Sequence, residues 1–116
     1  MKYMLLTYGI PAPGAHLEAS GNGAEDTLLA EIVETGEWVD RAPLADPALT
    51  RTVRVLDGAV GTTDGPFTAV AEQLTGYWLV DCESMGRALE LAALLAGTRT
   101  VAVEVRPLMD PSGMEM

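Results

Sequence analysis

The sequence predicts an α+β fold in which an antiparallel sheet carries both of its helices on one face. Segments typical of strands are interleaved with two segments whose apolar residues recur at helical offsets, in the order strand, helix, strand, hairpin, strand, helix, strand. An Asp57-Gly58 pair also stands between two short extended segments, and this arrangement is typical of an antiparallel hairpin. Together these patterns favour an open sheet over an all-helical or all-β fold.

The composition indicates a single domain formed by residues 1–116. Apolar residues make up 48% of the chain, which supports a core without a metal ion. A lone cysteine, Cys82, excludes an internal disulfide and favours a cytoplasmic location. The opening residues 1–8 contain too short an apolar run for a signal peptide, and no segment approaches the roughly 20 apolar residues of a membrane span. We therefore expect a cytoplasmic protein that does not act on a membrane.

The charge balance argues against a nucleic-acid partner. The chain has 17 acidic and 7 basic residues, for a formal net charge of −10. A phosphate backbone would be repelled by this field, and the few arginines are scattered along the sequence. The sign of a small ligand is not decided by the net charge, because a local arginine can override it.

In the first half of the chain, the helical pattern is the clearest signal. Apolar residues recur at offsets of three and four between Leu28 and Val33, and Glu25 and Asp26 suit the positive end of a helix dipole. Gly36 is a plausible helix end. The expected elements are a central strand at 2–8, a Gly- and Pro-rich loop at 9–23, a helix at 24–36, a short strand at 37–40 and a connection at 41–50.

The hairpin that follows is predicted from its turn. Asp57 and Gly58 accept the positive φ angles that a type I′ turn needs at both central positions. Folding the chain about this turn pairs Val55 with Val60, which places these two valines and Val53 on one face and Arg54 on the other. The register required by the turn therefore agrees with the apolar pattern.

In the second half, Ser84 is a natural N-cap for a helix with an apolar stripe, and Pro107 is expected to close the last strand. Gly97 would end the helix. The expected elements are one helical turn at 68–73, a strand at 76–82, a helix from Ser84 to Ala96, a strand at 101–107 and a frayed tail at 110–116.

Between hairpin and next strand lies Asp64-Gly65-Pro66-Phe67. Pro66 pushes Gly65 out of the helical region and lacks an amide hydrogen, so this segment is expected to leave the sheet, with Asp64 at its rim and Phe67 as an anchor. The tetrapeptide resembles the motif of the DGPF group of YCII-related proteins. Three further blocks match in order: Met-Lys-Tyr-Met-Leu-Leu-Thr-Tyr at 1–8, Glu-Gln-Leu at 72–74 with Gly-Tyr at 76–77, and Glu-Val-Arg-Pro-Leu-Met at 104–109.

This resemblance implies a ferredoxin-like α+β sandwich of the dimeric α+β barrel type. A sheet with helices on one face leaves its other face apolar, so a homodimer is also expected on physical grounds. Members of the DGPF group are often encoded beside extracytoplasmic-function sigma factors, which implies a sigma factor as a partner to consider.

Asp64 and His16 are the candidate acid/base residues. Asp64 is interpreted either as a general acid or base at the mouth of a cleft, or as a side chain that caps its own turn. The resemblance implies a histidine–aspartate pair in a pocket. His16, the only histidine, lies outside the matched blocks, and its alternative interpretation is an exposed loop residue.

Tyr8, Tyr77 and Arg106 are the candidate substrate-binding residues. The tyrosines stand at strand ends and are expected to line an apolar pocket while their hydroxyls reach a polar partner. Arg106 would hold an anionic group by paired hydrogen bonds, or alternatively form an ion pair with Glu104 or with a carboxylate of a neighbouring strand. Trp78 is expected in the core or a dimer interface.

Metal, cofactor and thiol chemistry are not indicated. No His, Cys or carboxylate spacing is typical of a metal site, and neither a nucleotide-binding Gly-rich motif nor a phosphate-binding lysine loop occurs, so no cofactor is expected. Cys82 follows Asp81, and an acidic neighbour raises the pKa of a thiol.

Two functions remain open at this point. The first is a small acid/base enzyme with lyase- or isomerase-like chemistry on a small carbonyl or aromatic compound. The second is a non-catalytic ligand-binding or regulatory protein, associated with a sigma factor.

Overall fold

The computed structural model describes residues 1–116 apart from 11–22, 69, 97–99, 111 and 114–116. It confirms the α+β class. The elements in chain order are β1 (Lys2–Gly9), α1 (Gly23–Thr35), β2 (Trp38–Pro43), a short 3₁₀ helix (Pro47–Leu49), β3 (Arg51–Leu56), β4 (Ala59–Asp64), β5 (Gln73–Asp81), α2 (Met85–Ala96) and β6 (Ala102–Pro107). His16 lies outside the described residues.

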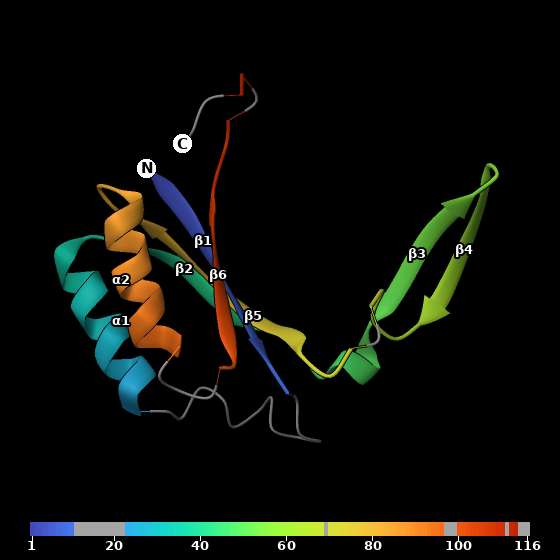
Figure 1. The fold of residues 1–116 in the computed structure, drawn as a ribbon, viewed down its shortest axis with the longest axis horizontal. Helices are drawn as coiled ribbons and strands as arrows, with labels where there is room; N and C mark the ends of the chain where they lie inside the picture. Colours follow the sequence, from blue (N-terminus) through green and yellow to red (C-terminus); the bar gives the residue numbers. More distant parts are fainter. Residues whose placement is uncertain (11–22, 69, 97–99, 111, 114–116) are drawn as a thin grey trace.

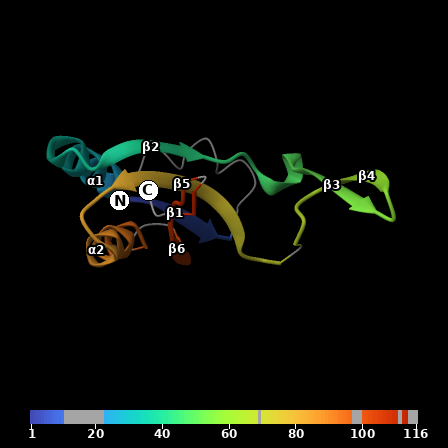
Figure 2. The ribbon, with the colours of Figure 1, turned by 90° about the horizontal axis from the view of Figure 1, so that it is seen from above.

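The main sheet has four strands in the order β2-β5-β1-β6, and the pairings β2–β5, β5–β1 and β1–β6 are all antiparallel. This order is that of a ferredoxin-like fold, and it confirms that residues 2–8 form a central strand. Both helices pack on one side of the sheet, as Figure 1 shows and Figure 2 shows from above.

The core lies between this sheet and the helices. Along β1, buried side chains alternate with partly exposed ones, so that Tyr3 and Leu5 face the helices. Trp78 is only 5% exposed, which confirms its predicted place in the core. The full set of buried apolar residues is Tyr3, Leu5, Leu28, Ile32, Trp78, Val80, Cys82, Ala88, Leu91, Ala92 and Leu95.

Two of the three helix ends singled out in the sequence are confirmed, and the third, Gly97, lies outside the described residues. Gly36 has a φ of +83°, its amide donates to Val33, and the Glu37 amide donates to Ile32, which together make a Schellman motif. At the start of α2, the Arg87 amide donates to the Ser84 hydroxyl at 3.2 Å, as expected of an N-cap.

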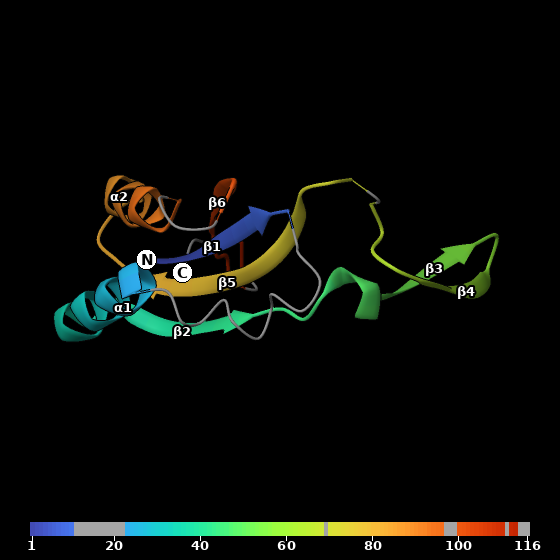
Figure 3. The same cartoon turned by 90° about the horizontal axis from the view of Figure 1, so that it is seen from below.

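The hairpin is also confirmed, because Asp57 and Gly58 have φ angles of 50° and 79° and Val55 pairs with Val60. It forms a separate two-stranded sheet, which we call the arm (residues 51–64). The arm extends away from the main sheet and both helices, as seen in Figures 1 and 3.

The prediction of Phe67 as a buried anchor is wrong for the single chain. Phe67 is 73% exposed. The one cation–π contact of its ring among the described residues is with Arg54, whose guanidinium carbon lies 5.2 Å from the ring centroid.

Two expectations about the connections are corrected. Residues 68–73 do not form a helical turn among the described positions: the Gln73 amide group donates to the carbonyls of Thr68 and Val70, which holds this segment in bends, and Gln73 already belongs to β5. The segment 41–50 is not only a connection, because pairing with β5 extends β2 to Pro43. Proline is tolerated there because β2 is an edge strand.

A bulge interrupts the pairing of β1 with β5. Thr7 is opposite Gly76 whereas Tyr8 is opposite Leu74, so Thr75 has no opposite residue. The Thr75 hydroxyl donates to the Thr7 carbonyl at 3.1 Å and stabilises the irregular pairing.

Candidate functional site

The side of the main sheet opposite the helices carries Tyr8, Tyr77 and Arg106. On β1, Met4, Leu6 and Tyr8 alternate with the buried residues and therefore point to this side. Leu6 is opposite Tyr77 on β5, and Met4 is opposite Arg106 on β6. We call this side the open face, because neither helix packs against it. The three predicted binding residues thus come from three adjacent strands onto one face.

Each tyrosine hydroxyl on the open face donates to a carboxylate of an outer strand. Tyr8 donates to Glu104 on β6 at 2.7 Å, and Tyr77 donates to Asp40 on β2 at 3.1 Å. The hydrogen bond to Glu104 raises the pKa of Tyr8, and the hydrogen bond to Asp40 raises the pKa of Tyr77. Both phenols are therefore neutral donors near neutral pH, and neither is suited to act as a base.

Arg106 is an exposed cation on the same face. Glu104, its predicted alternative partner, instead accepts the Tyr8 hydrogen bond, and Arg106 forms no ion pair with another described residue. Its positive charge partly offsets the rise in the pKa of Tyr8, whose first cause is the hydrogen bond to Glu104. Half-buried apolar side chains, among them Met4, Leu6 and Leu79, lie on the same face.

Asp64 is not on the open face of its own chain. It is the last residue of β4, directly opposite Arg51, and its carboxylate pairs with the Arg51 guanidinium at 3.1 Å. The Asp64 side chain is 85% exposed. In a single chain, therefore, the Asp64 carboxylate stands apart from Tyr8, Tyr77 and Arg106.

Comparison with known proteins places the chain in a family. The family model of the YCII-related domain matches residues 1–112. The chain belongs to the YCII-related family. A curated relative, described as an uncharacterized protein of Rhizobium meliloti (strain 1021), is 40% identical over 80 residues, which are 67% of this chain and 64% of the relative. The match thus spans less than two thirds of that relative's length.

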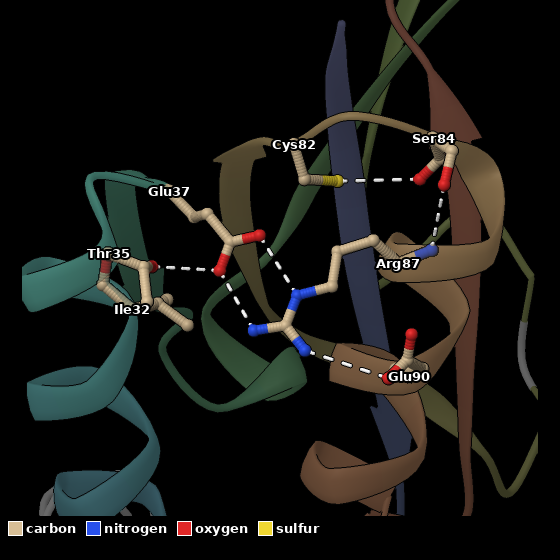
Figure 4. Close-up of polar contacts among 7 residues, drawn as sticks. All are labelled: Ile32, Thr35, Glu37, Cys82, Ser84, Arg87 and Glu90. Carbon is tan, nitrogen blue, oxygen red and sulfur yellow. Dashed lines mark hydrogen bonds and ion pairs between the residues drawn. The ribbon is translucent and has the colours of Figure 1, made fainter.

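The YCII-related chain has a second polar cluster that the sequence did not reveal (Figure 4). Arg87 on α2 donates through Nε and one terminal nitrogen to both oxygens of Glu37, each at 2.9 Å. Their side chains are only 23% and 15% exposed. Thr35 also donates to Glu37 at 2.8 Å. The two partners are 50 residues apart in the sequence, so local patterns give no signal for this pair.

A shallow hollow of about 580 Å³ adjoins this pair and is lined in part by Asp81 and Cys82. The Cys82 thiol is buried and donates to the Ser84 carbonyl at 3.6 Å, and burial raises the pKa of the thiol. Because Arg87 and Glu37 already satisfy each other, this pair is suited to joining α2 to the end of α1 rather than to holding a charged ligand.

Within the described part of the chain, no group of three or more His, Cys, Asp or Glu residues is arranged to hold a metal ion. The helices described there are likewise too short or too polar to cross a bilayer.

The tyrosine–carboxylate pairs of the open face can be tested by titration. We expect Glu104→Gln to lower the pKa of Tyr8 toward its ordinary value of 10.0, because the charged acceptor is lost. Asp40→Asn should likewise lower the pKa of Tyr77 and leave the pKa of Tyr8 unchanged. NMR titration with ¹³C-labelled tyrosine rings measures both. An unchanged Tyr8 titration in Glu104→Gln would show that the 2.7 Å hydrogen bond is not formed in solution.

Proposed function

We propose that this YCII-related protein binds a small organic acid with an aromatic or keto-bearing body on the open face. The observation that carries the proposal is that Arg106, a guanidinium without an ion-pair partner among the described residues, shares a partly apolar surface with two fixed phenol rings. Apolar walls with a few fixed polar groups are the usual composition of small-molecule sites.

Each residue has a distinct role in this proposal. Arg106 would pair with the ligand carboxylate through two parallel hydrogen bonds. The rings of Tyr8 and Tyr77 are held in place by their hydrogen bonds to Glu104 and Asp40, so they offer preorganised walls to the ligand body. Each phenolic oxygen still has a lone pair free to accept a hydrogen bond.

Binding is favoured over catalysis by the geometry of one chain. A lyase- or isomerase-like reaction needs a base beside the bound compound. Tyr8 and Tyr77 have raised pKa values and are poor bases near neutral pH. The Glu104 and Asp40 carboxylates on the same face already accept the hydrogen bonds of these phenols, and Asp64 stands on the arm, away from the open face. Acid/base chemistry with Asp64 remains the alternative, and it requires that the Asp64 of another copy of the chain reach the face.

We also propose that the protein is a homodimer in which the open face is covered. Half-buried Met4, Leu6 and Leu79 on that face would otherwise stay in contact with water, and covering them gives a favourable hydrophobic contribution.

A thermal-shift screen of benzoate, phenylacetate, pyruvate and related aromatic and keto acids tests the binding proposal. We expect at least one acid to stabilise the protein, and Arg106→Ala to weaken that acid's binding by about tenfold or more, the value of a lost charge-assisted hydrogen bond. Arg54→Ala is the matched control, because it removes an exposed arginine that lies on the arm and not on the open face. Equal binding to wild type and Arg106→Ala would contradict the proposal, as would a screen without any stabilising acid.

A further inference from the structure

We infer that the arm docks on the open face of a second copy of this chain, so that each binding site is built from two chains. The inference concerning the binding site rests on the proposed function, whereas the docking itself does not.

The arm has an apolar surface that its own chain leaves uncovered. Its valine face consists of Val53, Val55 and Val60, which are 64%, 64% and 69% exposed. An isolated two-stranded hairpin is marginally stable in water, and it becomes stable when it packs against further structure. Among the strands of the described residues, β3 and β4 pair only with each other, and they form a sheet separate from the main one. The valine face therefore requires a partner surface.

The direction of the arm identifies that surface. In Figures 1 and 3 the main sheet lies between the helices and the arm, so the arm projects on the side that the helices leave uncovered. A body that covers the open face from that side also meets the arm. One partner can thus bury two uncovered surfaces of the same chain.

A second copy of the chain meets this requirement by symmetry. In a two-fold contact each arm reaches the body of the other chain, so both arms and both open faces are buried in one closed assembly. The charges allow this contact. Arg51 and Arg54 balance Asp57 and Asp64, which gives the arm no net charge, so the whole formal charge of −10 resides in the rest of the chain. A neutral arm approaches an acidic body without the repulsion that two acidic bodies would have.

Docking of the arm would also change the composition of the binding site. Asp64 ends the arm and Phe67 follows it directly, and both are highly exposed in the single chain. Both lie at the base of the arm, and docking of the arm would bring them to the contact between the two chains. Asp64, which its own chain holds away from the open face, would then be supplied by the second copy.

Analytical ultracentrifugation tests the docking. We expect the wild type to sediment with twice the chain mass of 12.2 kDa, and Val53→Asp/Val55→Asp to sediment as a single chain. Leu89→Asp/Leu94→Asp is the matched control, since these leucines are 53% and 55% exposed on α2, and it should remain a dimer. A monomeric wild type, a dimeric arm variant or a monomeric control would overturn the inference.

Cross-linking tests the docking without a disruptive substitution. A photo-reactive phenylalanine at position 60 is introduced into a mixture of ¹⁴N- and ¹⁵N-labelled chains, and the cross-linked peptides are identified by mass spectrometry. We expect products that join position 60 of one label to residues 2–8 or 102–107 of the other. Products within one label only, or products with α1 or α2, would overturn the inference. Neither experiment uses a ligand, so a failed acid screen and a failed docking test are distinguishable.

Discussion

Replacing Gly76 with alanine is expected to destabilise the protein by about 1 to 3 kcal/mol, the usual cost of overpacking a tight site. An added Cβ would lie 2.8 Å from the Ala42 carbonyl oxygen and 3.3 Å from the Pro43 Cα, both backbone atoms of β2. Backbone atoms of a paired strand cannot rotate away as a side chain can. The edge strand β2 would therefore have to move off β5, and with it Asp40, the partner of Tyr77.

Gly61→Ala is the matched control for this change. Gly61 is also a strand glycine, but nothing lies within 4 Å of the position of its Cβ, so alanine should be tolerated with little change. Urea denaturation of the two variants and of the wild type measures the difference in the free energy of unfolding. Equal stabilities of Gly76→Ala and Gly61→Ala would mean that β2 and β5 are not packed as closely as described.

Arg87→Met is expected to cost about 2 kcal/mol of stability at neutral pH, because it leaves the largely buried Glu37 carboxylate without its two charge-assisted hydrogen bonds. Glu90→Gln is the control. It removes a 3.7 Å contact between Arg87 and a carboxylate that is 68% exposed, so it should change stability by less than about 1 kcal/mol.

The Glu37–Arg87 pair also predicts a dependence on pH. The hydrogen bonds from Arg87 lower the pKa of Glu37 below its ordinary value of 4.5. A carboxyl with a lowered pKa in the folded state stabilises the fold fully above its unfolded pKa, and this stabilisation is lost as the pH falls through the folded pKa. The gap in stability between wild type and Arg87→Met should therefore narrow below pH 4.5. A gap that stays constant with pH would contradict the assigned role of the pair.

Local sequence signals predicted local structure well. Asp57-Gly58 specified the turn, Gly36 and Ser84 specified helix ends, and each acts through its own backbone geometry or through neighbours within a few residues. Features that depend on contacts between distant segments were not predictable in this way. The separation of the arm from the main sheet and the Glu37–Arg87 pair both depend on which segments meet in space.

The same distinction between local patterns and distant contacts applies to the residues of the candidate site. Tyr8, Tyr77 and Arg106 share a face because strand alternation and antiparallel register determine it, and both were partly readable from the sequence. The position of Asp64 depends on the surface against which the arm packs. The sequence of a hairpin with an apolar face does not specify that surface. The role of Asp64, like that of His16, remains a prediction.

We propose above that the open face, with Tyr8, Tyr77 and Arg106, binds a small acid. The most direct test of this claim is an NMR titration of protein with ¹³C-labelled tyrosine rings, using the most stabilising acid of the screen. We predict that the ring signals of Tyr8 and Tyr77 shift in a saturable manner while the signal of Tyr3, which is buried at 1% exposure on the opposite side, stays in place, and that Arg106→Ala abolishes the shifts. Saturable binding that leaves Tyr8 and Tyr77 unshifted would contradict the claim.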